Sequence, residues 1–317
     1  MSQVLSHVIA SIGPASEASG ETARAHIASA GVPMLERLAR GLAAAQHTSR
    51  PRGTHRRILV AAGDHGCGDP GIAMGADHPT VIAARTIADG TAALCQVARA
   101  AATPIVLVDA GVREPTHMPG IAVQLGRGPS RNLIDEPALT VVDATLGLEA
   151  GIALAMSLSE DGLDLLALGA LGVGSEVASA ALLGAATGQP VMGLRDDVAE
   201  AAAARGVSYA RESGLERLAT FGGPETALLA GVILGSASIN VPVILDGYAT
   251  GAAALIAAAL APPVTGYLVA AHRGTFTMPA ILAHLGLEPI FDVGLGHGEG
   301  TGAAMLLPMI DQVIALV

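Results

Sequence analysis

Lysine is absent from this chain, and aromatic residues make up only 2% of it. Every residue with a permanent positive charge is arginine, and the formal net charge is −11 at pH 7. Nucleic acids and anionic membranes attract basic surfaces, so this balance argues against either one as a partner. The lack of lysine also excludes a Schiff-base lysine and the lysine of a Walker phosphate loop. With 51% apolar residues but few rings, the core must consist of Ala, Leu, Val and Ile with closely packed backbones.

Cysteine is nearly absent as well. Cys67 and Cys95 are too few and too far apart for a C-x-x-C motif or a disulfide framework, so a reducing cytoplasm is the default location. The N-terminus lacks the basic segment and the apolar run of a signal peptide. Two uncharged runs, 226–245 and 247–271, have the length of membrane spans, but internal prolines interrupt both. We therefore expect a soluble cytoplasmic protein.

From residue 57 onward, short apolar runs alternate with helical patterns. Such alternation is typical of right-handed β-α-β crossovers and a parallel sheet. We expect an α/β domain over residues 57–317, with a largely parallel, six-stranded, Rossmann-like sheet and helices on both faces. A helical segment, residues 1–50, precedes this domain and forms a small helical subdomain together with parts of the C-terminal region.

The boundaries of these elements follow from the same patterns. The predicted strands are 58–62, 105–109, 165–168, 242–245, 267–270 and 290–293. The predicted helices are 17–48 with a break near Pro33, 79–102, 146–160, 176–187, 224–238, 249–260 and 277–285. Residues 113–140 contain four prolines and predict a long irregular connection.

The most distinctive stretch, residues 289–302, lies near the C-terminus and ends in Gly298-Glu-Gly-Thr-Gly302. It predicts a short strand, a loop with glycine at every second position and an apolar helix. Glycine lets the backbone approach a ligand closely, and a helix start offers free N–H groups and a positive dipole end. Glu299 is thereby presented to a ligand, or it only complements the helix dipole. The density of glycine, which costs stability in an ordinary connection, favours a site.

Ligands of parallel α/β sheets bind beyond the carboxyl ends of the strands, so the loops there are the next candidates. The first carries Asp64-His65-Gly66-Cys67. These residue types bind zinc, but the spacing matches no standard site and adjacent side chains of an extended chain point apart, so we expect no metal. A second loop, 169–174, joins a strand to a small-residue helix through glycines. That arrangement is typical of an anion cradle, although any tight strand–helix turn also needs glycine.

These motifs resemble those of the nicotinate-nucleotide:dimethylbenzimidazole phosphoribosyltransferases, which make α-ribazole phosphate for the lower ligand of cobalamin. The resemblance extends from about residue 57 to the end and is strongest after residue 221. The glutamate of the family's Gly-Glu-Gly-Ser/Thr-Gly motif is the general base, which implies that role for Glu299. The resemblance further implies a cofactor-free, homodimeric pentosyltransferase with a phosphoribosyltransferase-like domain. It would move a ribosyl phosphate from nicotinate mononucleotide to an aromatic nitrogen base such as 5,6-dimethylbenzimidazole.

The resemblance also implies two groups of binding residues. For the donor nucleotide they are Gly172, Val173, Gly174, Ser175, Glu176, His272 and Arg273. For the base they are Asp64, His65, Ala73, Leu295 and His297.

Departures from the family pattern cluster on the donor side. Ala170 replaces an acid, Ser175-Glu176-Val177 replaces Asn-Thr-Thr, and Ala271 replaces a serine that helps to hold phosphate. Each lost hydroxyl is worth roughly 1.5–3 kcal/mol as a hydrogen bond to a charged group. The charge of Glu176 close to a phosphate dianion would cost on the order of 1–4 kcal/mol. In contrast, the stretch from Val243 to Tyr248 resembles the family's Val-Asp-Gly-Phe strand end.

Several interpretations of these departures stay open. Glu176 turns away from the phosphate, contacts ribose hydroxyls or is simply a favourable acid in the first turn of a helix. Arg273 either compensates for the lost hydrogen-bond donors or is an ordinary surface residue. At the level of the whole chain, the alternatives are a paralogue with a different donor or base and an inactive protein that binds a nucleotide or base.

Overall fold

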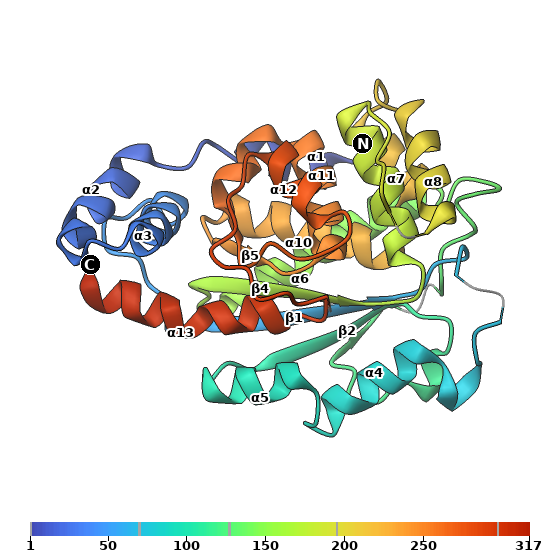
Figure 1. Ribbon diagram of the computed structural model, residues 1–317, viewed down its shortest axis with the longest axis horizontal. Helices are drawn as coiled ribbons and strands as arrows, with labels where there is room; N and C mark the ends of the chain where they lie inside the picture. Colours follow the sequence, from blue (N-terminus) through green and yellow to red (C-terminus); the bar gives the residue numbers. More distant parts are fainter. Residues whose placement is uncertain (1, 69–70, 126–127, 195, 297) are drawn as a thin grey trace.

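A six-stranded parallel sheet forms the centre of the protein (Figure 1). The computed structural model describes residues 2–68, 71–125, 128–194, 196–296 and 298–317. Within them the strands are β1 (Arg56–Gly63), β2 (Ile105–Gly111), β3 (Val123–Gln124), β4 (Leu165–Leu171), β5 (Val243–Leu245) and β6 (Leu268–Ala270). Their order is β3-β2-β1-β4-β5-β6, which is the order of doubly wound Rossmann sheets. The predicted fold class is therefore confirmed.

One of the predicted strands is wrong. Residues 290–293 make only an isolated bridge, between His272 and Phe291, because the chain turns into a glycine-rich loop directly afterwards, with Gly294 at a φ of 66°. The sixth strand is instead β3, in the segment predicted to be irregular, where Val123 pairs with Val108. A strand of two residues has no side-chain periodicity, so the sequence carries no signal for it.

Alternating side chains of β1 divide the apolar core into two parts. Leu59 and Ala61 pack into one part, whereas Ile58 and Val60 pack into the other. Figure 1 shows the two helical layers that complete these parts. The first layer contains α6 (Val141–Glu160), α7 (Ser175–Thr187), α8 (Asp197–Val207), α9 (Gly214–Phe221), α10 (Pro224–Ser238), α11 (Tyr248–Leu260) and α12 (Met278–Leu285). The second contains α4 (Pro79–Ala88), α5 (Ala93–Ala100) and α13 (Thr301–Leu316).

Small residues let the helices of the first layer pack very closely, as the composition predicts. A methyl group at Gly151 of α6 would overlap the carbonyl oxygen of Leu228 in α10, so only glycine fits there. In the part of the chain that the structure describes, α6 is the one helix long and apolar enough to cross a membrane. It packs against α10, whose residues are almost all buried.

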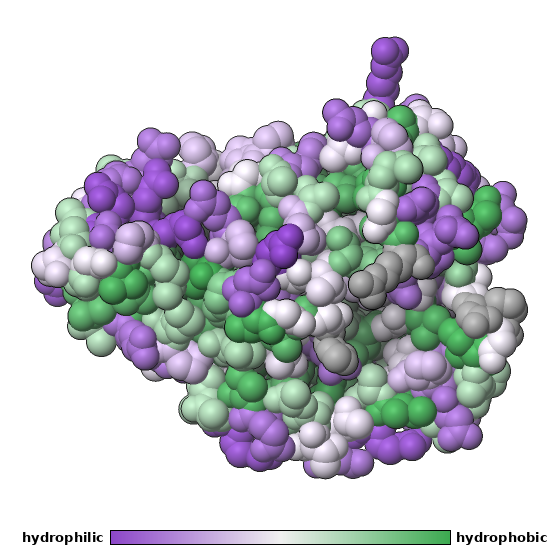
Figure 2. Space-filling model, viewed as in Figure 1, coloured by the Kyte–Doolittle hydropathy of each residue, from purple (hydrophilic) through white to green (hydrophobic). Residues whose placement is uncertain are grey.

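The N-terminal helices α1 (Gln3–Ser11), α2 (Glu17–Ile27) and α3 (Pro33–Ala45) contact both parts of the core. Leu5 of α1 joins the first part, and Leu38 and Leu42 of α3 join the second. Their outer surface is hydrophilic over α2 and α3 (Figure 2), where Glu21 pairs with Arg24 and Arg40. The break near Pro33 is confirmed, α1 was not predicted, and the division of the chain at residues 50–57 stays a prediction.

Candidate active site

A cavity of about 250 Å³ opens beyond the carboxyl ends of the central strands. It is lined by Pro79, Thr80, Ala83, Ala170, Leu171, Gly172, Val173, Ser175, Tyr248, Ala249, Gly296, Gly298 and Glu299. The order of the strands reverses between β1 and β4, and ligands of such sheets bind at this reversal. Two larger hollows, of about 750 and 680 Å³, lie beside α6 and α3 and contain none of the predicted site residues.

Four helices begin at this cavity. Pro79, Ser175 and Tyr248 are the first residues of α4, α7 and α11, and Glu299 stands two residues before α13. Helix starts carry free N–H groups and the positive end of the dipole, which favour a bound anion. None of the described residues lining the cavity is basic. The described lining residues therefore offer an anion neutral donors, and the sequence predicted the contributions of α7 and of the start of α13.

The loop that carries Glu299 is fixed against β4. The backbone N–H of Ala170 donates to the carbonyl oxygen of Gly298 at 2.8 Å. A methyl group at Gly169 would overlap the backbone of Glu299, and Gly300, at a φ of 100°, turns the chain into α13. Glu299 itself is half-buried and lines the cavity. Glycine thus presents this carboxylate as the sequence predicts, and its role as general base stays a prediction.

Asp246, at the end of β5, holds the start of α13. Its buried carboxylate accepts hydrogen bonds from the backbone N–H groups of Gly300, at 2.9 Å, and Ala303, at 2.8 Å. His272 Nε2 lies 3.3 Å from Asp246 Oδ1, without hydrogen-bond geometry. Its Nδ1 accepts the N–H of Gly274 at 3.0 Å, so a neutral ring carries its proton on Nε2. His272 therefore lies in the core behind α13 and is absent from the described lining of the cavity.

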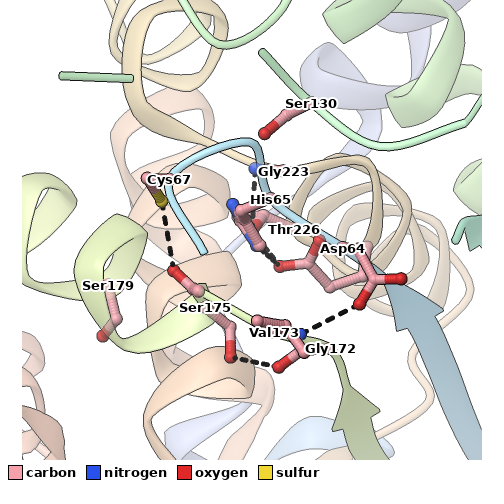
Figure 3. Close-up of polar contacts among 12 residues, drawn as sticks. Asp64, His65, Cys67, Ser130, Gly172, Val173, Ser175, Ser179, Gly223 and Thr226 are labelled. Atoms are coloured by element: carbon pink, nitrogen blue, oxygen red, sulfur yellow. Dashed lines mark hydrogen bonds and ion pairs between the residues drawn. The ribbon is translucent and has the colours of Figure 1, made fainter. Parts of the chain in front are cut away.

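Asp64 connects three loops behind the cavity. Its carboxylate accepts the backbone N–H of Val173 at 3.0 Å and of Arg113 at 2.8 Å, and the hydroxyl of Thr80 at 2.5 Å. Figure 3 shows the bond to Val173 between the ends of β1 and β4. The side chain is 1% exposed. Because Val173 and Thr80 both line the cavity, Asp64 sets the separation of two cavity walls from behind them.

His65 faces Glu225, which lies in the first turn of α10. The two side chains are buried, with Nε2 and Oε1 at 2.9 Å. Burial acts to lower the pKa of His65, but the charge and hydrogen bond of Glu225, with the charges of Asp64 and Glu176, raise this pKa above its ordinary value. The sequence did not predict this pair, because only the fold brings residues 160 positions apart into contact.

The remaining predicted residues lie in different surroundings. Gly172, Val173 and Ser175 line the cavity, and Gly174 caps α7 at a φ of 86°. Glu176, in the first turn of α7, and Leu295 are both half-buried. Neither is among the described residues that line the cavity.

Two predicted residues lie at the surface, and one lies outside the described residues. Ala73 is exposed, and so is Arg273, which pairs with Asp292 at 3.4 Å. His297 lies outside the described residues. Among those described, no group of three or more His, Cys, Asp or Glu side chains is placed to hold a metal.

Comparison with known proteins shows the family. A family model described as "Phosphoribosyltransferase" matches residues 12–317. The nicotinate-nucleotide–dimethylbenzimidazole phosphoribosyltransferase of Roseiflexus sp. (strain RS-1) is 37% identical over 323 residues, which cover 95% of this chain and 91% of the relative. The protein of the same name from Escherichia coli O9:H4 (strain HS) is 32% identical over 276 residues, with 82% and 77% coverage.

A solved structure agrees with these relatives. The crystal structure of the Thermus thermophilus protein of that name has a TM-score of 0.83 and 29% identity, and the match covers 95% of this chain and 96% of that one. The chain belongs to the phosphoribosyltransferase family, together with the nicotinate-nucleotide–dimethylbenzimidazole phosphoribosyltransferases.

Proposed function

We propose that this protein transfers a ribosyl phosphate from nicotinate mononucleotide to a nitrogen of an aromatic base such as 5,6-dimethylbenzimidazole, giving an α-ribazole-phosphate-type product. The position of Glu299 carries the proposal. It is the one acidic residue among the described residues that line the cavity, and it lies where four helix starts converge. The relatives at 32–37% identity carry the name of this reaction.

The proposed chemistry needs one carboxylate and no cofactor. The bond between the ribose and the pyridinium nitrogen of the donor breaks, and its electron pair neutralises that nitrogen as nicotinate leaves. A ring nitrogen of the incoming base forms the new bond to the same ribose carbon. Glu299 takes the proton that this base loses, and its negative charge favours the positive charge that develops on the ribose.

We place the donor phosphate at the starts of α7 and α11. Gly172, Val173 and Ser175 line this part of the cavity, and the neutral N–H groups of helix starts suit a dianion. Glu176 is absent from the described lining, which supports the interpretation that it turns away from the phosphate. Gly174 then acts by capping the start of α7, and His272 by packing against Gly302 at the start of α13. We propose no direct donor contact for the exposed Arg273.

We further propose a homodimer in the cytoplasm. Apolar side chains at the start of α6 support an interface between two copies, because Val141, Val142 and Leu146 are 50%, 66% and 37% exposed. Light scattering of the wild type and of Val142→Asp tests this. A dimer that becomes monomeric in the variant supports the interface, whereas a wild-type monomer contradicts it.

The function is tested by incubating the protein with nicotinate mononucleotide and 5,6-dimethylbenzimidazole, with chromatography and mass spectrometry as readouts. We expect one nicotinate released for each ribosylated base formed. The same assay with the unphosphorylated riboside tests the donor, since faster turnover of the riboside would indicate an altered donor. Thermal stabilisation by both substrates without product would instead indicate a binding protein that has lost catalysis.

A further inference from the structure

Tyr248 lines the cavity from the start of a helix. It is the first residue of α11 and lines the cavity together with Ser175, the first residue of α7, and Glu299. The side chains of Tyr248 and Ser175 interact, and this interaction acts to lower the pKa of the phenol. Two helix starts therefore bring two hydroxyl groups together on one wall.

The hydroxyl groups that line the cavity differ in the acceptors to which they donate hydrogen bonds. Thr80 donates its proton to the carboxylate of Asp64 at 2.5 Å. Ser175 donates to the carbonyl oxygen of Gly172 at 3.3 Å. The phenol of Tyr248 interacts with the hydroxyl of Ser175, and an anionic oxygen is a much stronger acceptor than a neutral hydroxyl. A bound anion would therefore take the O–H of Tyr248 away from Ser175.

The surroundings keep Tyr248 protonated and in place. Burial raises its pKa to about 12, and the charges of Glu176 and Glu225 act in the same direction. At neutral pH the phenol is therefore a neutral donor that adds no negative charge beside an anion. Its ring packs against Phe276, with centroids 5.6 Å apart, and its carbonyl oxygen accepts the hydroxyl of Ser179 at 3.4 Å.

Because no basic residue is among the described residues that line the cavity, the phenol of Tyr248 is a candidate donor for a bound anion. The chain has no lysine, and the described lining of the cavity has no arginine, so the described lining residues offer an anion only neutral donors and helix starts. We infer that the hydroxyl of Tyr248 binds the phosphate of the donor nucleotide, donating a hydrogen bond to one phosphate oxygen. This inference rests on the proposed function and names a donor contact for that reaction.

Tyr248→Phe tests the inference, because it removes one oxygen atom and keeps the ring. A hydrogen bond to a charged group corresponds to about a tenfold or larger change in affinity. We expect the KM for nicotinate mononucleotide to rise about tenfold or more, with kcat changed by less than about twofold. The unphosphorylated riboside should show the same KM with both proteins. An unchanged KM for the mononucleotide, or an equal loss with the riboside, would overturn the inference, since an equal loss indicates a ribose contact or a structural defect.

Tyr267→Phe is the matched control. Its buried hydroxyl donates to the carbonyl oxygen of Gly13 at 3.1 Å. Tyr267 is not among the described residues that line the cavity, so the KM for the mononucleotide should not change. Wild-type turnover, measured first, separates the two proposals. If it is absent, the proposed function fails, and the Tyr248 contact is tested with inorganic phosphate in thermal melting. Stabilisation of the wild type that Tyr248→Phe loses supports the contact, and equal stabilisation of both proteins, or of neither, refutes it.

Discussion

The carboxylate of Asp246 accepts the backbone N–H of Gly300 at 2.9 Å, directly after Glu299 in the chain. These residues are 54 positions apart and belong to the end of β5 and the start of α13. The bond fixes the glycine at which the Glu299 loop turns into its helix. The position of the proposed base therefore depends on a buried acid that does not line the cavity.

Asp246→Asn should weaken the hydrogen bonds that fix the loop of Glu299 at the start of α13. The amide keeps one acceptor oxygen but places an N–H₂ group against one of two backbone N–H donors. We expect the free energy of unfolding in urea to fall by about 1–3 kcal/mol and kcat to fall about tenfold or more because Glu299 is misplaced. The control is Asp292→Asn at an exposed position. Unchanged kcat in Asp246→Asn would contradict the supporting role.

Gly169→Ala should displace Glu299 from the side of β4. The new methyl group would overlap the backbone of Glu299, which has to move. We expect a loss of stability of about 1–3 kcal/mol and a fall in kcat of about a hundredfold. Gly41→Ala is the control, because its methyl group meets nothing within 4 Å in the middle of α3, and alanine there should be neutral or stabilising. Equal kcat values in the two variants would refute the argument.

Local sequence patterns identified part of this site and missed the rest. Glu299 and the turn at Gly172 stand in compact glycine-rich motifs, so adjacent residues predict them. The contacts of Asp64 with Val173, and of His65 with Glu225, depend on which strands and helices become neighbours, and no local pattern records that. The implied donor residue His272 lies in the core behind α13 because β6 runs beside β5. Tyr248 belongs to a stretch that resembles a family motif, but the sequence did not predict that its side chain lines the cavity.

The sequence likewise predicted some elements of the fold and missed others. Short apolar runs predicted β1, β2, β4, β5 and β6, most of whose residues are buried. The sequence failed at β3, which is only two residues long, and at residues 290–293, where one bridge replaces a strand. It also missed the helices α8 and α9, which join the core mainly through alanine and leucine residues such as Ala202 and Leu218.

His65 should make stability depend on pH. Its pKa is raised in the folded protein above the ordinary value of 6.5, so the folded state holds the proton more tightly than the unfolded state. The stabilisation is therefore fully present below about pH 6.5 and is lost as the pH rises through the folded pKa. We expect the free energy of unfolding to decline over this range in the wild type and to decline less in His65→Gln. The same decline in both proteins would exclude His65 as its source.

Cys67 should react slowly with alkylating reagents. Burial raises the pKa of its thiol to about 12, and nearby acids add to this effect. Only about one thiol in 10⁴ is then ionised at pH 8, and the thiolate is the reactive form. In a Cys95→Ser background, iodoacetamide should label the native protein far more slowly than the urea-unfolded protein. The rate should rise about tenfold per pH unit, whereas fast labelling at pH 8 would contradict the assigned environment.

The most direct test of the proposed base is Glu299→Gln, assayed with nicotinate mononucleotide and 5,6-dimethylbenzimidazole. The amide has nearly the shape of the carboxylate but cannot take a proton, so kcat should fall by about 10²–10⁴-fold while thermal melting and the KM for the donor stay near the wild-type values. A variant with near-normal kcat would contradict the assignment of Glu299 as the base.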